Sequence, residues 1–128
     1  IVATDHAPHP VESKQCEWLN AAIGMVGLET AFPVLYSTLI KNGRLSWARA
    51  IEVMSALPAK IAGYTNHGRE IAIGAPAHLA VINPAGRLVV DRRKLVSKSK
   101  NTPFHGMEFD GIVVATVFNG HLTHKVGD

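Results

Sequence analysis

The chain has 128 residues and a mass of 13.8 kDa, which is one domain's worth of polypeptide and enough to bury a hydrophobic core. Hydrophobic residues make up 47% of the sequence and charged residues 18%, a balance that excludes disordered, collagenous and coiled-coil proteins. The 13 basic and 10 acidic residues give a net charge of +3, and the basic residues are scattered, so the sequence does not indicate a nucleic-acid partner.

The sequence also argues against membrane and secreted proteins. The longest stretch without Asp, Glu, Lys or Arg covers residues 71–86, and Pro76 and Pro84 interrupt it, so it is too short and broken to span a bilayer. The single cysteine, Cys16, cannot form an internal disulfide, and no secretory signal pattern is present, so we expect a cytoplasmic location. A complete eight-stranded α/β barrel needs roughly 250 residues, more than the chain supplies.

The first half of the chain predicts one strand followed by helices. The apolar residues 1–4 stop at Asp5, which indicates a buried strand ending in a polar loop that extends to about Ala21. A helix should follow, in which Pro33 is tolerable only near the first turn or at a kink, with Asn42 and Gly43 ending it. Its expected buried face consists of Leu28, Phe32, Leu35 and Leu39.

Ser46 is the expected N-cap of a second helix, with Trp47, Ile51 and Met54 forming its buried stripe. A third, short helix should begin at residues 57–59 and stop before Gly63.

The second half predicts short strands at residues 70–73, 79–83, 88–91, 111–118 and 121–125. Turn residues separate these segments, and Asn119-Gly120 is a strong signal for a two-residue hairpin turn. The fold class is therefore α/β, with helices in the first half and strands in the second.

Three ionisable side chains follow the first apolar run: Asp5, His6 and His9. At the strand end of a parallel barrel, a carboxylate can bind a metal and accept a proton from metal-bound water. His9, beyond the stiffening Pro8, could offer a cation or a hydrogen-bond donor to an anionic substrate. From residue types alone, the simpler interpretation is that Asp5 caps the following turn and the histidines are exposed loop residues.

The run Ile-Val-Ala-Thr-Asp-His-Ala-Pro-His at residues 1–9 resembles the last active-site strand of the dihydroorotase family, in particular the bacterial type I branch of the amidohydrolase superfamily. Four further matches follow in chain order. They are a glycine-containing loop and helix at residues 24–31, an S-x-x-P-A-x-I-x-G segment at 55–63, a strand pair at 68–83 and an S-K-x-x-N-T-P-F motif at 97–104. His78 departs from the family, which usually has Asp there.

The resemblance implies roles for particular residues. Asp5 corresponds to the catalytic aspartate, a metal ligand that also moves a proton between the attacking hydroxide and the leaving amide nitrogen. His9 corresponds to the histidine that binds the substrate carboxylate, and the backbone around Gly27 to the loop that hydrogen-bonds the pyrimidine ring. His6 is left with two possible roles, support of neighbouring groups or substrate contact.

The resemblance also implies zinc as the cofactor. The family's other ligands, an H-x-H pair, a carboxylated lysine in many members and two more histidines, precede the segment matched here. We therefore expect a C-terminal fragment of a metal-dependent (β/α)8 amidohydrolase barrel, with the last strand, active-site loop and outer helices at residues 1–67. Residues 68–128 should be the β-rich part of a composite β-sandwich domain. The fragment alone should be inactive and bind zinc weakly, because Asp5 supplies one ligand.

The implied activity is the interconversion of N-carbamoyl-L-aspartate and L-dihydroorotate in pyrimidine synthesis. A hydantoinase-like or allantoinase-like enzyme is an alternative, although a cation-capable His9 favours a substrate that carries a carboxylate. Another alternative is an inactive dihydroorotase-like subunit that braces aspartate transcarbamoylase. The expected partners are the small-molecule substrate, the rest of the barrel, and either a second copy of the protein or aspartate transcarbamoylase.

The remaining candidates favour structural roles. Residues 101–104 are expected to form a structural turn, and Trp18 and Trp47 are expected to be core or loop anchors. Four histidines lack metal-ligand spacing with any carboxylate, namely His67, His105, His121 and His124.

Overall fold

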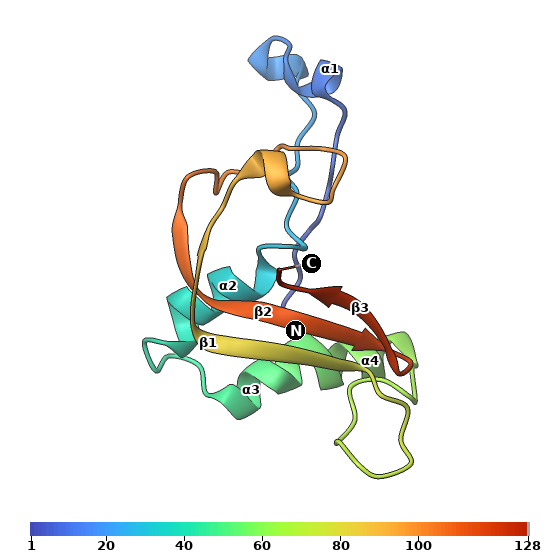
Figure 1. Ribbon diagram of the computed structural model, residues 1–128. Helices are drawn as coiled ribbons and strands as arrows, with labels where there is room; N and C mark the ends of the chain where they lie inside the picture. Colours follow the sequence, from blue (N-terminus) through green and yellow to red (C-terminus); the bar gives the residue numbers. More distant parts are fainter. Residues whose placement is uncertain (128) are drawn as a thin grey trace.

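The computed structural model describes residues 1–127, in which helical segments pack against a three-stranded antiparallel sheet (Figure 1). The helical segments are α1 (Val11–Lys14), η1 (Trp18–Asn20), α2 (Ala31–Leu35), η2 (Tyr36–Ile40), α3 (Trp47–Ile51), η3 (Glu52–Ala56), α4 (Leu57–Ala62) and η4 (Arg92–Lys94). The strands are β1 (Leu79–Val89), β2 (Glu108–Phe118) and β3 (His121–Lys125), in that order across the sheet. The predicted mixed α/β class is confirmed. Within the described residues, none of the helices has the length and apolarity needed to cross a bilayer.

Two longer helical rods arise because shorter segments join end to end. α2 continues into the π-helical η2, and α3 continues through the π-helical η3 into α4, so the predicted second and third helices are one. Pro33 lies in the first turn of α2, where its missing N–H costs no helical hydrogen bond. Ser46 caps α3 as predicted, since its Oγ accepts from the Arg49 N–H at 3.2 Å. Gly63, at φ +73°, ends the rod.

The buried face of the second rod differs from the prediction. Ala50 and Val53 are the buried residues, at 4% and 7% exposure, whereas Ile51 is 61% exposed and Trp47 is 41% exposed. Met54 is partly buried. Apolar residues occupy more than one side of this helix, and the side that packs on the first rod and on the N-terminal segment is the one that is buried. The predicted stripe was therefore wrong at two of its three positions.

The core of the helical half is small. Leu35, Ile40 and Ala50 form its buried cluster, which is covered by partly buried Val2, Phe32, Tyr36, Leu39, Leu45 and Met54. The Trp47 ring packs beside Phe32 and Tyr36, with centroids 6.3 and 5.6 Å away. Trp47 thus anchors the two rods to each other as expected. Leu28, expected on the buried face of the first rod, lies before α2 and is 61% exposed.

Residues 1–4 form no β-strand, and Ile1 and Ala3 are exposed, so the prediction of a buried strand is contradicted for the described structure. Val2 donates its N–H to the Val53 carbonyl of the second rod at 3.0 Å. A strand is defined by hydrogen bonding to a neighbouring strand, and residues 1–4 have no such neighbour within residues 1–127.

The sheet merges two predicted strands and omits one. β1 includes residues 79–83 and the first half of 88–91, joined across an irregularity at which Asn83 Oδ1 accepts from the Ala85 N–H at 3.0 Å. Residues 70–73 are not a strand, and Ile71 and Ile73 are exposed. The hairpin between β2 and β3 is confirmed, since Asn119 and Gly120 both have positive φ, at +49° and +79°.

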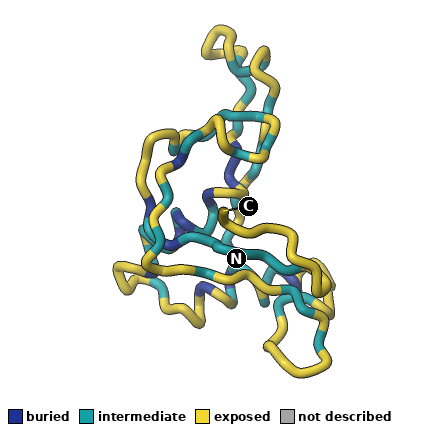
Figure 2. The backbone as a smooth tube through the Cα atoms, in the orientation of Figure 1, coloured by how far each residue is buried: buried dark blue, intermediate teal, exposed yellow. Residues whose placement is uncertain are grey.

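The segment after the candidate loop projects away from the sheet and the rods, with α1 near its tip (Figure 1). Most of this segment is exposed (Figure 2). Trp18 is 91% exposed and Leu19 is 94% exposed, so the expectation that Trp18 is an anchor is wrong for the described fold. Cys16, also in this segment, is a free, exposed thiol.

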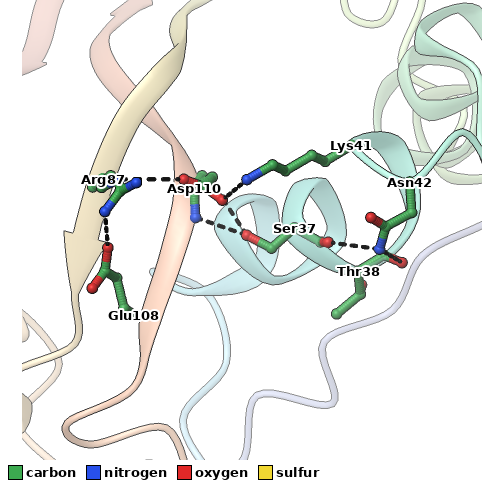
Figure 3. A network of polar contacts seen from close by, with 7 residues as sticks. All are labelled: Ser37, Thr38, Lys41, Asn42, Arg87, Glu108 and Asp110. Atoms are coloured by element: carbon green, nitrogen blue, oxygen red, sulfur yellow. Dashed lines mark hydrogen bonds and ion pairs between the residues drawn. The ribbon is translucent and has the colours of Figure 1, made fainter.

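A polar network fastens η2 to the sheet (Figure 3). The Asp110 N–H of β2 donates to Ser37 Oγ at 2.8 Å, and the Asp110 carboxylate forms an ion pair with Lys41. Arg87 of β1 lies 2.9 Å from the Glu108 carboxylate and 3.7 Å from that of Asp110. The hydrogen bond from Lys41 holds the pKa of the Asp110 carboxyl below its ordinary value.

We expect Asp110→Asn to lower the thermal unfolding midpoint of the full-length protein at about pH 7. A lowered pKa in the folded state means that the carboxylate stabilises the fold above its ordinary pKa of about 3.9, and that this contribution disappears as the pH falls below that value. The difference between wild type and Asp110→Asn should therefore shrink at about pH 3. Circular dichroism melting measures both midpoints, with the exposed Glu70→Gln as a control. Equal midpoints at the higher pH would contradict the role given to the ion pair.

Gly111→Ala should destabilise the fold much more than Gly43→Ala. Both glycines have left-handed φ values, +74° and +68°, so both substitutions strain the backbone by roughly 1–2 kcal/mol. A Cβ at Gly111 would lie 2.5 Å from Tyr36 Cδ1, whereas a Cβ at Gly43 meets no atom within 4 Å. Overpacking adds about 1–3 kcal/mol at Gly111 alone. Denaturant unfolding measures the contrast, and equal losses for the two variants would show that the Tyr36 contact has no energetic effect.

Candidate active-site loop

Asp5 occupies a strained and accessible position. Its φ is +46°, in the left-handed region that Asp adopts more readily than most residues, and the residue is exposed. Its carboxylate has no hydrogen bond or ion pair with any other residue in the range 1–127, so Asp5 does not cap the following turn. The structure thus presents a carboxylate that can bind a metal or move a proton without first breaking a bond to the fold.

His6 joins two segments that are distant in sequence. Its Nδ1 accepts from the Gly27 N–H at 3.0 Å and more weakly from the Leu28 N–H at 3.4 Å. The neighbouring Ala7 N–H donates to the Met25 carbonyl at 2.8 Å, and residues 6 and 25 form a parallel β-bridge. The Asp5 turn and the Gly27 loop, which the sequence predicts to be parts of one site, therefore lie side by side.

Two glycines permit this close approach. A Cβ at Gly27 would lie 3.0 Å from the Thr4 carbonyl oxygen, and Gly27 itself is buried. Gly24 has φ +136°, and a Cβ there would lie 2.5 Å from Ala7 Cβ. Only a residue without a side chain fits at Gly24.

His9 is held by the same second segment. Its Nε2 lies 2.9 Å from the Ile23 carbonyl oxygen. Since a carbonyl only accepts, Nε2 must carry the proton, and Nδ1 is the ring nitrogen left to meet another group. The His9 carbonyl in turn accepts from Ser99 Oγ at 2.8 Å.

The C-terminal half clamps this pair of segments, which sequence reasoning did not anticipate in detail. Asn101 Nδ2 donates to the Gly24 carbonyl at 3.0 Å, and the Asn101 carbonyl accepts from the Val26 N–H at 3.4 Å. From the projecting segment, Lys14 Nζ adds hydrogen bonds to the carbonyls of Ala22 and Gly24 at 2.6 and 3.0 Å. The structural role predicted for residues 101–104 thus includes holding the backbone at Gly24 and Val26. The S-K-x-x-N-T-P-F motif was visible in the sequence, but the backbone that it contacts could not be predicted from it.

The described residues could supply one ligand of a metal site, the Asp5 carboxylate. Among residues 1–127, no group of three or more His, Cys, Asp and Glu side chains is placed to hold a metal ion. The unpaired Asp5 carboxylate fits as one oxygen ligand, and a catalytic metal would need about two further protein ligands from outside these residues. A neighbouring cavity of about 190 Å³ is lined mainly by apolar groups, including Val2, Leu35 and Phe104, and does not include Asp5 or His9.

Comparison with known proteins agrees with the resemblance noted in the sequence. The model of the amidohydrolase family matches residues 1–123. Dihydroorotase from Streptomyces coelicolor is 50% identical over 123 residues, which cover 96% of this chain and 29% of that protein. Dihydroorotase from Leifsonia xyli is 47% identical over 123 residues, covering 96% of this chain and 28% of that protein. The chain thus spans less than a third of the length of these relatives.

Solved structures show the same likeness. The L-hydantoinase (dihydropyrimidinase) from Arthrobacter aurescens superposes with a TM-score of 0.86 at 35% identity, covering 97% of this chain and 28% of that one. The D-hydantoinase (dihydropyrimidinase) from Thermus sp. superposes with a TM-score of 0.84 at 26% identity and the same coverage. The family match over residues 1–123, together with these relatives, shows that the chain belongs to the amidohydrolase family.

Proposed function

We propose that the chain is the C-terminal part of a dihydroorotase, which forms and hydrolyses the cyclic amide that relates N-carbamoyl-L-aspartate to L-dihydroorotate. The observation that carries this proposal is the unpaired, exposed carboxylate of Asp5 in a loop that also holds His6 and His9. Relatives at 50% and 47% identity are named dihydroorotase, whereas the hydantoinase-named structure reaches 35%.

Asp5 would move the proton of the reaction. In the hydrolytic direction its carboxylate accepts a proton from the attacking water and delivers it to the amide nitrogen as the ring C–N bond breaks. In the cyclising direction the same carboxylate takes a proton from the nitrogen that attacks the carboxyl carbon and gives it to the departing hydroxide. Both steps require a carboxylate that is free of structural bonds, as Asp5 is.

Members of the amidohydrolase and dihydroorotase families are generally metal-dependent. We propose zinc here, with an Asp5 oxygen as one ligand and the others outside the described residues. When bound, zinc would polarise the amide carbonyl and make the attacking water more acidic.

His9 would bind the substrate carboxylate. Because Nε2–H is committed to the Ile23 carbonyl, only a ring that is also protonated at Nδ1 can donate to an anion. Such a charge-assisted hydrogen bond favours dihydroorotate over a hydantoin that lacks the carboxylate.

Gly27 would contribute through its backbone. Its N–H is already paired with His6, and its carbonyl receives only a weak contact from Thr30 Oγ1 at 3.4 Å. The carbonyl can therefore still accept from a ring N–H of the substrate, since a carbonyl oxygen has two lone pairs.

We also propose where the two halves of the chain lie in the complete protein. Residues 1–67 would supply the last strand, active-site loop and outer helices of a (β/α)8 barrel, and residues 68–128 part of a composite β-sandwich. In that setting residues 1–4 would gain the strand neighbours that they lack here. The proposed location is the cytoplasm, and the proposed partners are the rest of the barrel with a second copy or aspartate transcarbamoylase.

A hydantoinase-type amidohydrolase is the second candidate, favoured by the TM-score of 0.86 to the Arthrobacter aurescens enzyme. An inactive subunit that braces aspartate transcarbamoylase is a third candidate. The intact Asp5 and His9 argue against this third candidate, since a subunit without activity has no need to keep them.

Asp5→Asn in the full-length protein should abolish most turnover in both directions. The amide keeps the shape of the side chain but cannot act as a base, which typically costs roughly 10²–10⁴-fold, and the weakened metal contact should add to the loss. Steady-state kinetics with dihydroorotate and with carbamoyl aspartate, alongside metal analysis, measures both effects. Glu12→Gln on the projecting segment is the control. Near-normal turnover in Asp5→Asn would show that this loop has been assigned wrongly.

His9→Asn should act mainly on substrate binding. Loss of a hydrogen bond to a charged group costs about 1.5–3 kcal/mol, or roughly ten- to a hundredfold in kcat/KM, with metal content unchanged. The same assays apply, with His121→Asn on the exposed strand β3 as the matched control. If His9→Asn removed the metal, His9 would be a ligand instead of a carboxylate-binding residue.

A further inference from the structure

The His6 ring fixes the backbone of the loop opposite it. Gly27 is buried, and its N–H has His6 Nδ1 as its acceptor at 3.0 Å. The Leu28 N–H points to the same nitrogen at 3.4 Å. No other acceptor for either N–H lies within the described residues. Without the ring, a buried donor would therefore be left unpaired, which a fold avoids by shifting the backbone or admitting water.

The same contacts fix the tautomer of the ring. A backbone amide always donates, so Nδ1 must be unprotonated, and the proton of the neutral ring sits on Nε2. Nε2–H meets no acceptor in the part of the chain that the structure describes. The ring thus presents one nitrogen to the Gly27 loop and leaves the other for contact with groups beyond it.

His6 lies between the two groups proposed to act on the substrate, the Asp5 carboxylate and the Gly27 backbone. His6 directly follows Asp5, which has a left-handed backbone conformation. The β-bridge between His6 and Met25 therefore begins one residue after Asp5. The His6 side chain holds Gly27, whose carbonyl is the group proposed above to accept from the substrate ring. A change at His6 Nδ1 would therefore be felt first at the substrate-binding loop, while the carboxylate of Asp5 would keep its place through the backbone bridge.

We propose that His6 is a positioning residue: as the Nε2-protonated tautomer, it uses Nδ1 to hold the Gly27–Leu28 backbone in register with the Asp5 turn. This inference rests on the dihydroorotase function proposed above, and it assigns His6 the supporting role in preference to a direct substrate contact. The residue is needed for its acceptor at the Nδ1 position and not for its charge or for Nε2–H.

Three substitutions in the full-length protein separate these roles. His6→Asn places an amide oxygen where Nδ1 lies and so keeps the acceptor, while it removes the Nε2–H. His6→Gln carries the same amide one methylene further out, and His6→Leu removes the acceptor entirely. Comparing Asn with Gln therefore tests the location of the acceptor with chemistry held constant.

We expect His6→Asn to stay close to wild type in kcat/KM for dihydroorotate. His6→Leu and His6→Gln should lose roughly 10- to 100-fold, the range typical of groups that orient a site, with most of the change in KM and with metal content unchanged. A general loss of protein stability would not lower kcat/KM in His6→Gln while leaving it unchanged in His6→Asn. If Asn were as impaired as Leu, Nε2–H would be the working group and the positioning role would be overturned.

A readout without catalysis keeps the inference separate from the function on which it rests. Hydrogen exchange of peptides covering residues 25–30 should quicken in His6→Leu and His6→Gln but not in His6→Asn, because only the Asn variant still protects the Gly27 amide. Unchanged exchange in His6→Leu would overturn the inference. If wild type failed to process dihydroorotate while the exchange contrast held, the proposed function would fail and the positioning role of His6 would stand.

Discussion

The pairing of residues 6–7 with residues 25–28 is the interaction on which the rest of the site depends. The His6 and Ala7 contacts, together with the one from His9 to Ile23, bring the Asp5 turn to the Gly27 loop across about twenty intervening residues. Those residues form a largely exposed projection that offers little packing of its own (Figure 2). The pairing is therefore held by a few hydrogen bonds, and the absence of side chains at Gly24 and Gly27 permits it.

Support for this pairing comes from far along the chain. Ser99 and Asn101 bind the backbone of His9 and Gly24, and the Glu29 carboxylate accepts from the N–H groups of Val96 and Ser97 at 2.9 and 3.1 Å. The network around Asp110 then ties the first helical rod to the sheet (Figure 3). The β-rich half thus positions the loop that would carry the chemistry, although it contributes no residue to the proposed reaction.

Local signals in the sequence predicted local structure well. The Ser46 cap, the first-turn Pro33 and the Asn119-Gly120 hairpin each depend on a few adjacent residues, and each is confirmed. Features that depend on a partner were harder to predict. The buried face of the second rod was misassigned because Trp47 and Ile51 are as apolar as the Ala50 and Val53 that meet the core. Residues 1–4 and 70–73 have strand-like composition but no neighbouring strand in the described structure.

In the candidate site, too, residues of a local motif were predicted and contacts between distant segments were not. Asp5 and His9 were identified from the motif and from resemblance, whereas composition alone favoured a cap and exposed histidines. The carboxylate of Asp5 proved not to cap. The part played by His6, and the clamp from Asn101 to Gly24, could not be predicted, because each joins segments that the sequence places 20 or more residues apart. Their residue types were visible in advance, but their acceptors and donors are backbone groups, which carry no sequence signal.

The most direct test of the proposed function compares two substrates on one enzyme. Steady-state kinetics of the full-length wild-type protein should be measured with L-dihydroorotate and with a hydantoin under identical conditions. A charged hydrogen bond to the carboxylate predicts that kcat/KM is roughly ten- to a hundredfold higher for dihydroorotate. Equal or faster turnover of the hydantoin, or no turnover of dihydroorotate by the metal-loaded protein, would contradict the proposal.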